Sequence, residues 1–193
     1  MRVISGAARG RRLKEPIGLD VRPTGDKVKE SVFDAIQFNI EGKRILDLFA
    51  GTGQMGIEAL SRGARECVFV DAAPNAIKLV GENLALCGFT DSASLHIRDA
   101  SKYIERCGVF DIIFIDPPYD TQLAGAILQK IIEFDKLDND GIIICETRAD
   151  TVLQPVEPPY YEQKTYMHGS VKITRFVKRV VDLEMEKRDS GSH

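Results

Sequence analysis

An apolar segment that runs straight into a glycine-rich turn constrains the fold of this chain more than any other feature. Residues 45–50, Ile-Leu-Asp-Leu-Phe-Ala, have the pattern of a buried strand, and Gly51, Gly53 and Gly56 precede a helical pattern over 57–62. Glycines in such a turn let the backbone approach a ligand and let the helix pack tightly on the strand. The order predicts a site for a nucleotide-like cofactor, although the glycine spacing alone would suit NAD as well.

The rest of the chain alternates between strand and helix patterns. Strands are predicted at 44–50, 66–71, 94–97, 110–115 and 141–146, and helices at 26–39, 55–62, 75–87, 101–107 and 122–134. Such alternation predicts an α/β fold, a mostly parallel sheet with helices on both faces. Extended runs at 161–167 and 171–177 flank a turn at His168-Gly169-Ser170. They predict a C-terminal antiparallel hairpin, which is characteristic of the Rossmann-like sheet of class I methyltransferases.

Acidic residues lie near the ends of three predicted strands, where open parallel sheets bind their ligands. Asp47 precedes the glycines and is placed to face the cationic amine of S-adenosylmethionine, whereas it would repel the pyrophosphate of NAD. Asp71 lies 18 residues after Gly53, close to the spacing of an acid that binds ribose hydroxyls. Asp99 is a candidate acceptor for the adenine amino group, and the alternative is that it caps the helix beginning near Ser101.

The predicted cofactor site consists of these carboxylates, the glycine-rich loop and the backbone N–H of Ala100. A ribose carboxylate fits NAD and S-adenosylmethionine equally, so Asp47 is the residue that favours S-adenosylmethionine. The predicted set is Asp47, Phe49, Ala50, Gly51, Thr52, Gly53, Gly56, Asp71, Asp99 and Ala100.

A second motif, Asp116-Pro117-Pro118-Tyr119, follows the apolar run 110–115. The Asp116 carboxylate and the Pro117 carbonyl can each accept one N–H of a planar exocyclic amine, while both prolines restrict the backbone. The ring of Tyr119 offers a surface on which a base can stack. Two acceptors on one nitrogen direct its lone pair towards an electrophile, so the four residues are predicted to catalyse amine methylation. The alternative is a rigid turn that ends a strand.

Basic residues gather near both ends of the sequence, although the whole chain has a formal charge of -3. Residues 1–30 contain eight Lys or Arg against four acids, and residues 164–193 contain seven against four. The segment between them contains 11 against 21. Basic ends beside an acidic middle predict a phosphate-binding surface around the active site, and ordinary solvated charge is the alternative.

Cysteine, histidine and hydropathy patterns argue against several other classes of protein. The four cysteines form no C-x-x-C pair, which indicates reduced thiols and a cytoplasmic location. The three histidines have no metal-like spacing, so no metal site is expected. No apolar run approaches the length of a membrane span, and no membrane association is expected.

Segments spread over most of the chain carry a family resemblance. They are residues 2–6, 9–13, 22–24, 26–30 with Phe33, 47–56, 58–64, 114–119, and Tyr166, Gly169 and Thr174. On these residues the chain resembles the RsmD-type bacterial 16S ribosomal RNA guanine-N2 methyltransferases. Arg22-Pro23-Thr24 is the distinguishing block, because other methyltransferases share the glycine-rich loop and the Asp-Pro-Pro-Tyr motif. The chain departs from the family at Asp71, where Glu is common, and at Gln54-Met55.

The resemblance implies methyl transfer from S-adenosylmethionine to N2 of a guanine in 16S ribosomal RNA, within an assembling 30S particle and by a monomer. Arg22 is expected to bind RNA, and helix capping or surface charge is the alternative role. For His168 the alternative to an RNA contact is a turn residue without a function. The residues then expected to bind RNA are Arg9, Arg11, Arg12, Arg22, Thr24, Lys27, Lys29 and His168.

The expected organisation has three segments. Residues 1–40 form a basic N-terminal hairpin and helix extension that binds RNA, and residues 41–180 form the methyltransferase domain. Residues 181–193 form a tail that shows no family resemblance, and its end, Gly191-Ser192-His193, is expected to be left from cloning.

Three other functions compete with this prediction. Methylation of adenine N6 in DNA or RNA uses the same acceptor chemistry, but many DNA enzymes need a separate recognition domain, for which 193 residues leave little room. An NAD-binding oxidoreductase would explain the glycine-rich loop but not residues 116–119. A non-catalytic module of methyltransferase fold would bind RNA and transfer no methyl group.

Overall fold

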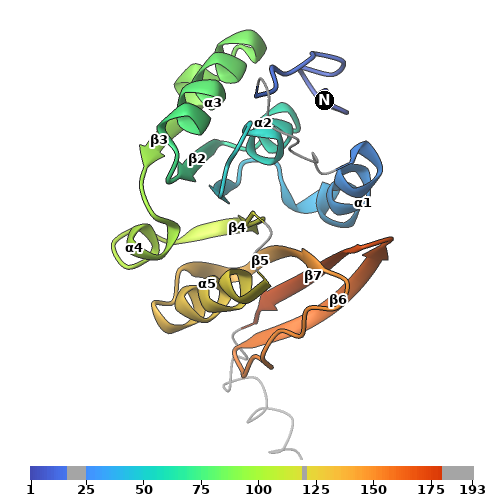
Figure 1. The fold of residues 1–193 in the computed structure, drawn as a ribbon, viewed down its shortest axis with the longest axis vertical. Coiled ribbons are helices and arrows are strands. Elements are labelled where there is room, and N and C mark those ends of the chain that lie inside the picture. Colours follow the sequence, from blue (N-terminus) through green and yellow to red (C-terminus); the bar gives the residue numbers. More distant parts are fainter. Residues whose placement is uncertain (17–24, 119–120, 180–193) are drawn as a thin grey trace, which may run out of the picture.

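The computed structural model describes residues 1–16, 25–118 and 121–179, and the described strands form one seven-stranded sheet (Figure 1). The strand order is β3-β2-β1-β4-β5-β7-β6. Neighbours among β1 to β5 are parallel, whereas β7 pairs antiparallel with both β5 and β6. The strands are β1 (Arg44–Leu48), β2 (Glu66–Asp71), β3 (Ala93–Ile97), β4 (Phe110–Ile115), β5 (Leu137–Arg148), β6 (Tyr160–His168) and β7 (Val171–Lys178). The predicted fold class and the C-terminal hairpin are confirmed.

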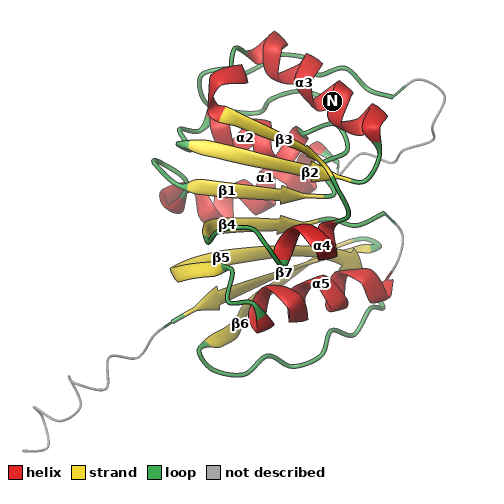
Figure 2. Cartoon of the chain, turned by 90° about the vertical axis from the view of Figure 1, so that its left-hand side faces the viewer, coloured by secondary structure: helices red, strands yellow, loops and turns green. Residues whose placement is uncertain are grey.

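Helices cover both faces of the sheet. Figure 2 shows α4 and α5 in front of the sheet and α1 and α2 behind it. The buried side chains divide accordingly into one core under α1, α2 and α3 and another under α4 and α5. No helix in the described part of the chain is long and apolar enough to cross a membrane. The helices are α1 (Asp26–Ile36), α2 (Gln54–Ser61), α3 (Pro74–Cys87), α4 (Ala100–Ile104) and α5 (Thr121–Glu133), with 3-10 turns at Gln37–Asn39 and Thr90–Ser92.

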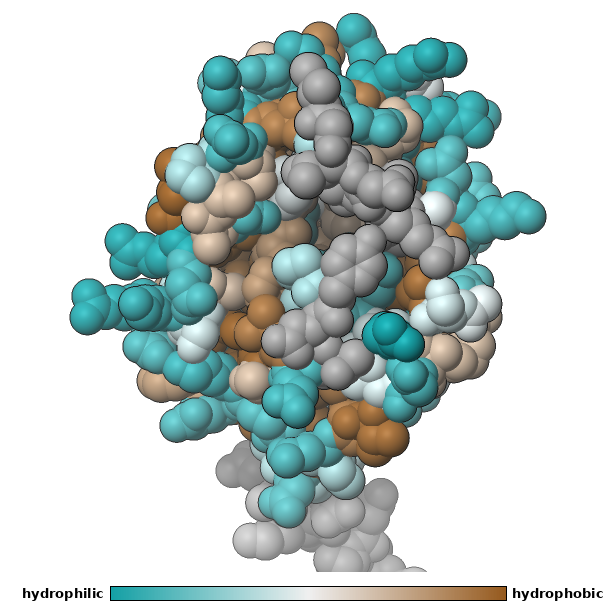
Figure 3. Space-filling view, viewed as in Figure 1, coloured by the Kyte–Doolittle hydropathy of each residue, from teal (hydrophilic) through white to brown (hydrophobic). Residues whose placement is uncertain are grey.

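Burial explains why the strands differ in sequence. Both central strands, β1 and β4, are buried almost throughout, because helices cover the sheet on each side of them. The edge strand β6 is mostly exposed and correspondingly polar. Figure 3 shows one face of the whole molecule, where hydrophilic side chains form the periphery and hydrophobic ones gather towards the middle.

The N-terminal segment forms a hairpin that packs into the main core. The Val3 N–H donates to the Arg11 carbonyl at 2.9 Å, and the Gly10 N–H donates to the Val3 carbonyl at 2.9 Å. Val3, Ala8 and Leu13 are buried in the core shared by α1, α2 and β1. The predicted segments 1–40 and 41–180 therefore share one hydrophobic core, and the hairpin lies beside α2 (Figure 1).

Candidate active site

The carboxyl ends of β1, β2 and β4 meet at one edge of the sheet, because the three strands are parallel and adjacent. A pocket of about 1480 Å³ lies at this edge. It exceeds the ~300–1,000 Å³ of a typical small-molecule site, so it has room for a second ligand beside a cofactor. The predicted residues that line it are Asp47, Phe49, Ala50, Gly51, Thr52, Asp71, Asp99, Ala100, Asp116, Pro117, Pro118 and His168.

The glycine-rich loop owes its shape to backbone conformations that favour glycine. Gly51 and Gly53 have φ angles of 55° and 78°, in the left-handed region. Gly56 serves another purpose, since a Cβ there would lie 2.3 Å from the Phe69 ring and 2.6 Å from Cys67 Sγ. Gly53 and Gly56 are not among the residues that line the pocket. Gly56 lets α2 pack closely on β2, and its predicted cofactor contact stays a prediction.

Asp47 is a buried carboxyl at the base of the pocket. Its Oδ2 accepts a hydrogen bond from the Gly56 N–H at 2.9 Å, which ties β1 to the start of α2. Burial raises the pKa of Asp47 to about 8, and the nearby charges of Asp116 and Asp71 act in the same direction. A cationic ligand group beside this carboxyl would favour its ionised form, so the position fits the amine of a methionine moiety.

Asp71 joins the glycine-rich loop to the turn that follows β2. Its Oδ2 accepts from the Gly51 N–H at 3.0 Å and its Oδ1 accepts from the Ala73 N–H at 2.8 Å. Each carboxylate oxygen has a second lone pair, so Asp71 can still accept from ribose hydroxyls.

Asp99 caps a helix and also lines the pocket. Its side chain accepts from the Lys102 N–H at 3.0 Å, and α4 begins at Ala100, one residue before the expected start. The capping alternative is therefore confirmed. The side chain remains exposed, so the cap does not exclude a second contact with a ligand.

The acceptor motif follows β4, and its residues Asp116, Pro117 and Pro118 line the pocket. Asp116 is partly buried, and its charge raises the pKa of both Asp47 and Cys145, although burial is the larger cause in each case. Val28 of α1, Glu146 of β5 and His168 of the terminal hairpin also line the pocket. Tyr119 lies outside the described residues.

Four of the predicted RNA-binding residues, Arg9, Arg11, Arg12 and Lys27, are exposed. His168 lies at the hairpin turn with Nε2 3.1 Å from Ser31 Oγ, so the turn contacts α1 at the mouth of the pocket. Arg22 and Thr24 lie outside the described residues.

Lys29 corrects the predicted RNA interface. Its side chain is 0% exposed, and Nζ donates to the Arg2 carbonyl at 2.6 Å and lies 3.7 Å from Glu58 Oε2. The Glu58 carboxylate also accepts from the backbone N–H groups of Ile4 and Ser5, at 2.7 and 3.0 Å. Lys29 therefore helps to hold the N-terminal hairpin on α2, and it is not accessible to RNA in this structure.

Several residues that line or support the site are absent from the sequence-based prediction. Met1, Lys14 and Glu15 line the pocket, and the Thr52 hydroxyl lies 3.2 Å from Met1 Sδ. Asn83 on α3 is fully buried and contacts both Lys14 and the loop carbonyl of Thr52. A polar residue on the apolar face of a helix was the one available hint of such a contact.

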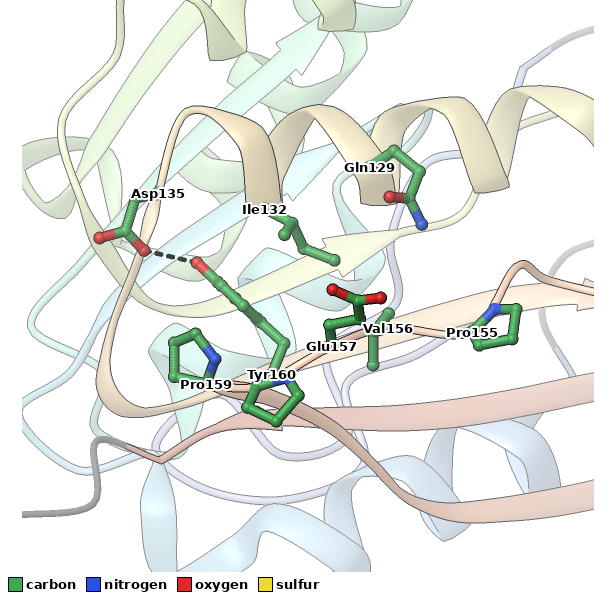
Figure 4. A pocket seen from close by; sticks show the side chains of 9 residues that line it. Gln129, Ile132, Asp135, Pro155, Val156, Glu157, Pro159 and Tyr160 are labelled. Carbon is green, nitrogen blue, oxygen red and sulfur yellow. Dashed lines mark hydrogen bonds between the residues drawn. The ribbon is translucent and has the colours of Figure 1, made fainter.

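A smaller cavity of about 500 Å³ lies away from the motifs, between α5 and residues 155–160 (Figure 4). The Tyr160 hydroxyl donates to Asp135 at 2.6 Å, and Lys178 lies 2.8 Å from the same Asp135 oxygen. Asp135, one of the two carboxylates that line this cavity, is thus already paired. Within the described ranges no cluster of three or more His, Cys, Asp or Glu residues could hold a metal ion.

The chain is similar to known proteins over most of its length. The family described as "Conserved hypothetical protein 95" matches residues 1–176. A Bacillus subtilis protein named "Putative rRNA methyltransferase YlbH" is 46% identical over 183 residues, which cover 93% of this chain and 100% of that protein. The "Ribosomal RNA small subunit methyltransferase D" of Haemophilus influenzae is 32% identical over 157 residues, covering 79% of this chain and 81% of the relative.

The solved structures agree with these sequence matches. The structure described as "Putative methyltransferase yhhF from Escherichia coli" superposes with a TM-score of 0.84 at 26% identity, and covers 93% of this chain and 98% of that one. The family match over residues 1–176 includes both motifs, and the superposed structure also covers most of the chain. The chain belongs to the Conserved hypothetical protein 95 family, and its resemblance to the RsmD-type methyltransferases is confirmed.

Proposed function

We propose that this protein transfers a methyl group from S-adenosylmethionine to the exocyclic N2 amine of a guanine in 16S ribosomal RNA. One observation carries the proposal. Asp116, Pro117 and Pro118 line the same pocket as the glycine-rich loop and Asp71. Acceptors for an amine and a site for an adenosine-containing donor thus lie together. The relatives named as ribosomal RNA methyltransferases support ribosomal RNA as the substrate class.

The residues present fit S-adenosylmethionine better than a dinucleotide. The buried Asp47 suits a cationic amine, Asp71 suits the ribose hydroxyls, and Asp99 with the Ala100 N–H suits the adenine edge. A pyrophosphate would instead lie close to the three carboxylates Asp47, Asp71 and Asp116. When bound, S-adenosylmethionine supplies a methyl group on a sulfonium sulfur, which leaves as a neutral thioether.

The acceptor motif positions the amine and takes up charge. The Asp116 carboxylate and the Pro117 carbonyl accept the two N–H groups of guanine N2, which turns the nitrogen lone pair out of conjugation with the ring. An ordinary aspartate, with a pKa of about 3.9, is too weak a base to deprotonate this amine beforehand. The proton leaves once the nitrogen carries the new methyl group and a positive charge, and Asp116 is placed to accept it.

The target base must leave its stack to reach Asp116, because a stacked guanine cannot place N2 at the base of a pocket. We place the RNA backbone on the exposed basic side chains of the N-terminal hairpin and on Lys27, which contribute a phosphate-binding surface. The proposed substrate is a partly assembled 30S particle in the cytoplasm, and the proposed active form is a monomer.

Mapping of modified nucleosides tests this function. Small subunits from cells that lack the protein are incubated with labelled S-adenosylmethionine and the purified protein, and mass spectrometry then locates the methyl group in the 16S RNA. The expected product is N2-methylguanosine at one position. N6-methyladenosine would replace the proposal with the adenine alternative. Absence of any transferred methyl group, with RNA binding retained, would favour the non-catalytic module. Binding of NADH in place of S-adenosylmethionine would favour the oxidoreductase.

A further inference from the structure

Two carboxylates lie side by side at the acceptor end of the pocket. Ile115 of β4 and Cys145 of β5 are the last register partners in these parallel strands, which lie ~5 Å apart, so the residues that follow them, Asp116 and Glu146, are neighbours at the same edge of the sheet. Both residues line the pocket. The charges of both also raise the pKa of Cys145, after burial as the main cause, which places the two carboxylates near one thiol.

Strand alternation places Glu146 on the same face of the sheet as Ile144, which packs in the core under α1, α2 and α3. Val28 of α1 and His168 of the terminal hairpin line the pocket on this side. Glu146 is partly exposed, so its side chain is accessible from the pocket. Glu146 therefore lines the same pocket as the acceptor motif, Val28 and His168.

A carboxylate in this position distinguishes the two amino purines. The Watson–Crick edge of guanine presents N1–H and N2–H as adjacent donors, and carboxylate oxygens only accept. Adenine presents its N6 amine beside N1, which is an acceptor. A carboxylate next to adenine N1 would face a lone pair without a proton, and an unpaired polar contact of this kind opposes binding.

We propose that Glu146 accepts the N1–H of the target guanine while Asp116 and Pro117 hold its N2 amine, which makes Glu146 the residue that selects guanine over adenine. This inference rests on the proposed function. It goes further by assigning the choice of base to a residue outside both sequence motifs.

Replacement of N1–H in the substrate tests this assignment directly. Small subunits are reconstituted with 16S RNA that carries either guanine or 2-aminopurine at the mapped nucleotide, because 2-aminopurine keeps the N2 amine and has a lone pair at N1. The wild-type protein should prefer guanine in kcat/KM. Glu146→Gln should lower kcat/KM for guanine by about 10-fold to 100-fold, the effect of ~1–3 kcal/mol expected for one base contact. The Gln amide can donate to N1 of 2-aminopurine, so the preference for guanine should shrink or reverse.

Binding provides a readout that does not depend on methyl transfer. The fluorescence of 2-aminopurine reports its uptake by Glu146→Gln and by the wild type without S-adenosylmethionine, and the variant should bind this RNA more tightly. Glu146→Asp keeps the carboxylate and should retain the preference for guanine at a lower rate. Glu133→Gln, an exposed carboxylate at the end of α5, is the matched control and should match the wild type.

The two hypotheses fail in different ways. If the wild-type protein methylates no guanine, the proposed function is wrong. If it methylates guanine and Glu146→Gln leaves the ratio of guanine to 2-aminopurine unchanged, only the role of Glu146 is overturned. Equal loss of guanine preference in Glu146→Asp and Glu146→Gln would also overturn it, because the carboxylate would then not be the deciding group.

Discussion

The Asn83 side chain pairs with the backbone of Lys14 in both directions. Its Oδ1 accepts from the Lys14 N–H at 2.7 Å, and its Nδ2 donates to the Lys14 carbonyl at 3.1 Å. The same Nδ2 donates to the Thr52 carbonyl at 2.9 Å. One buried amide therefore joins the N-terminal segment, α3 and the glycine-rich loop, which makes the N-terminal segment part of the proposed cofactor site.

Replacement of this amide should weaken both stability and cofactor binding. Asn83→Ala leaves the Lys14 and Thr52 backbone groups without partners, at a cost of about 1–3 kcal/mol for each group that stays buried. Urea denaturation should show a lower free energy of unfolding, and calorimetry should show a larger Kd for S-adenosylmethionine. Asn139→Ala changes an exposed asparagine of β5 and should alter neither quantity. An unchanged Kd for S-adenosylmethionine in Asn83→Ala would show that the N-terminal segment does not contribute to the cofactor site.

Cofactor affinity should depend on pH through Asp47. Burial raises the pKa of Asp47 to about 8, so the free protein holds a proton there below pH 8. A bound cation favours the carboxylate and lowers this pKa in the complex, so binding releases a proton. The Kd for S-adenosylmethionine should therefore fall as pH rises from 6 to 8, by at most about tenfold per unit, and then level off. Calorimetry in buffers of different ionisation enthalpy measures the released proton.

Asp47→Asn provides the control for this titration. The amide cannot ionise, so its Kd should be larger than that of the wild type at pH 8 and should not change between pH 6 and pH 8. A pH-independent Kd in the wild type, or the same slope in both proteins, would show that another group is responsible.

Lys27 and Lys29 lie two residues apart on α1 and should have opposite phenotypes. Lys29 is buried against Glu58, which keeps Arg62 as a second partner at 2.8 Å. Lys29→Ala therefore removes one ion pair and the hydrogen bond to the Arg2 carbonyl, and should reduce the free energy of unfolding by about 1–3 kcal/mol. Lys27 is exposed, so Lys27→Ala should leave stability unchanged and weaken RNA binding. Urea titration and RNA binding of both variants check the pair. Equal effects on RNA affinity in two folded variants would restore Lys29 to the RNA interface.

The N-terminal hairpin should account for a measurable part of the salt dependence. Replacement of Arg9, Arg11 and Arg12 by alanine removes three exposed charges, each worth about 0.7 in the slope of log K against log salt concentration. The slope for RNA binding should therefore decrease by about 2. Arg106→Ala removes one exposed charge beyond α4, on the other face of the sheet, and should leave the slope unchanged. Identical slopes for the triple variant and the wild type would show that these arginines are ordinary solvated charges that do not contact RNA.

Asp116 should affect the chemical step and not the binding of the cofactor. Asp116→Ala removes one of the two acceptors for the amine and should lower kcat by at least about 10²–10³, while the Kd for S-adenosylmethionine stays within a few fold of the wild type. Asp116→Asn retains a carbonyl acceptor and should lose less. Single-turnover methyl transfer measures both variants, and wild-type rates in Asp116→Ala would remove this residue from the mechanism.

Local patterns were sufficient to predict most of the elements. The strands predicted at 66–71 and 110–115 coincide with β2 and β4, because each contains a short apolar run, 67–70 and 112–115, that ends at an aspartate. The strand predicted at 141–146 proved longer. β5 begins at Leu137, which pairs with Phe110 of β4. Residues 138–140, between Leu137 and the predicted start at 141, are polar and carry no apolar alternation. Pairing with a neighbouring strand extended β5 beyond what its own sequence indicates.

The sequence by itself determined the order of the elements, the glycine-rich loop and the acceptor motif, since each depends on residue types at short spacing. Tertiary structure alone decided that Lys29 is buried while Lys27 is exposed, that Asn83 joins Lys14 to the loop, and that Glu146 lies beside Asp116. These outcomes depend on contacts between segments far apart in the chain. No local pattern specifies which side chains such contacts bury or bring together, because packing of the whole sheet and its helices decides this.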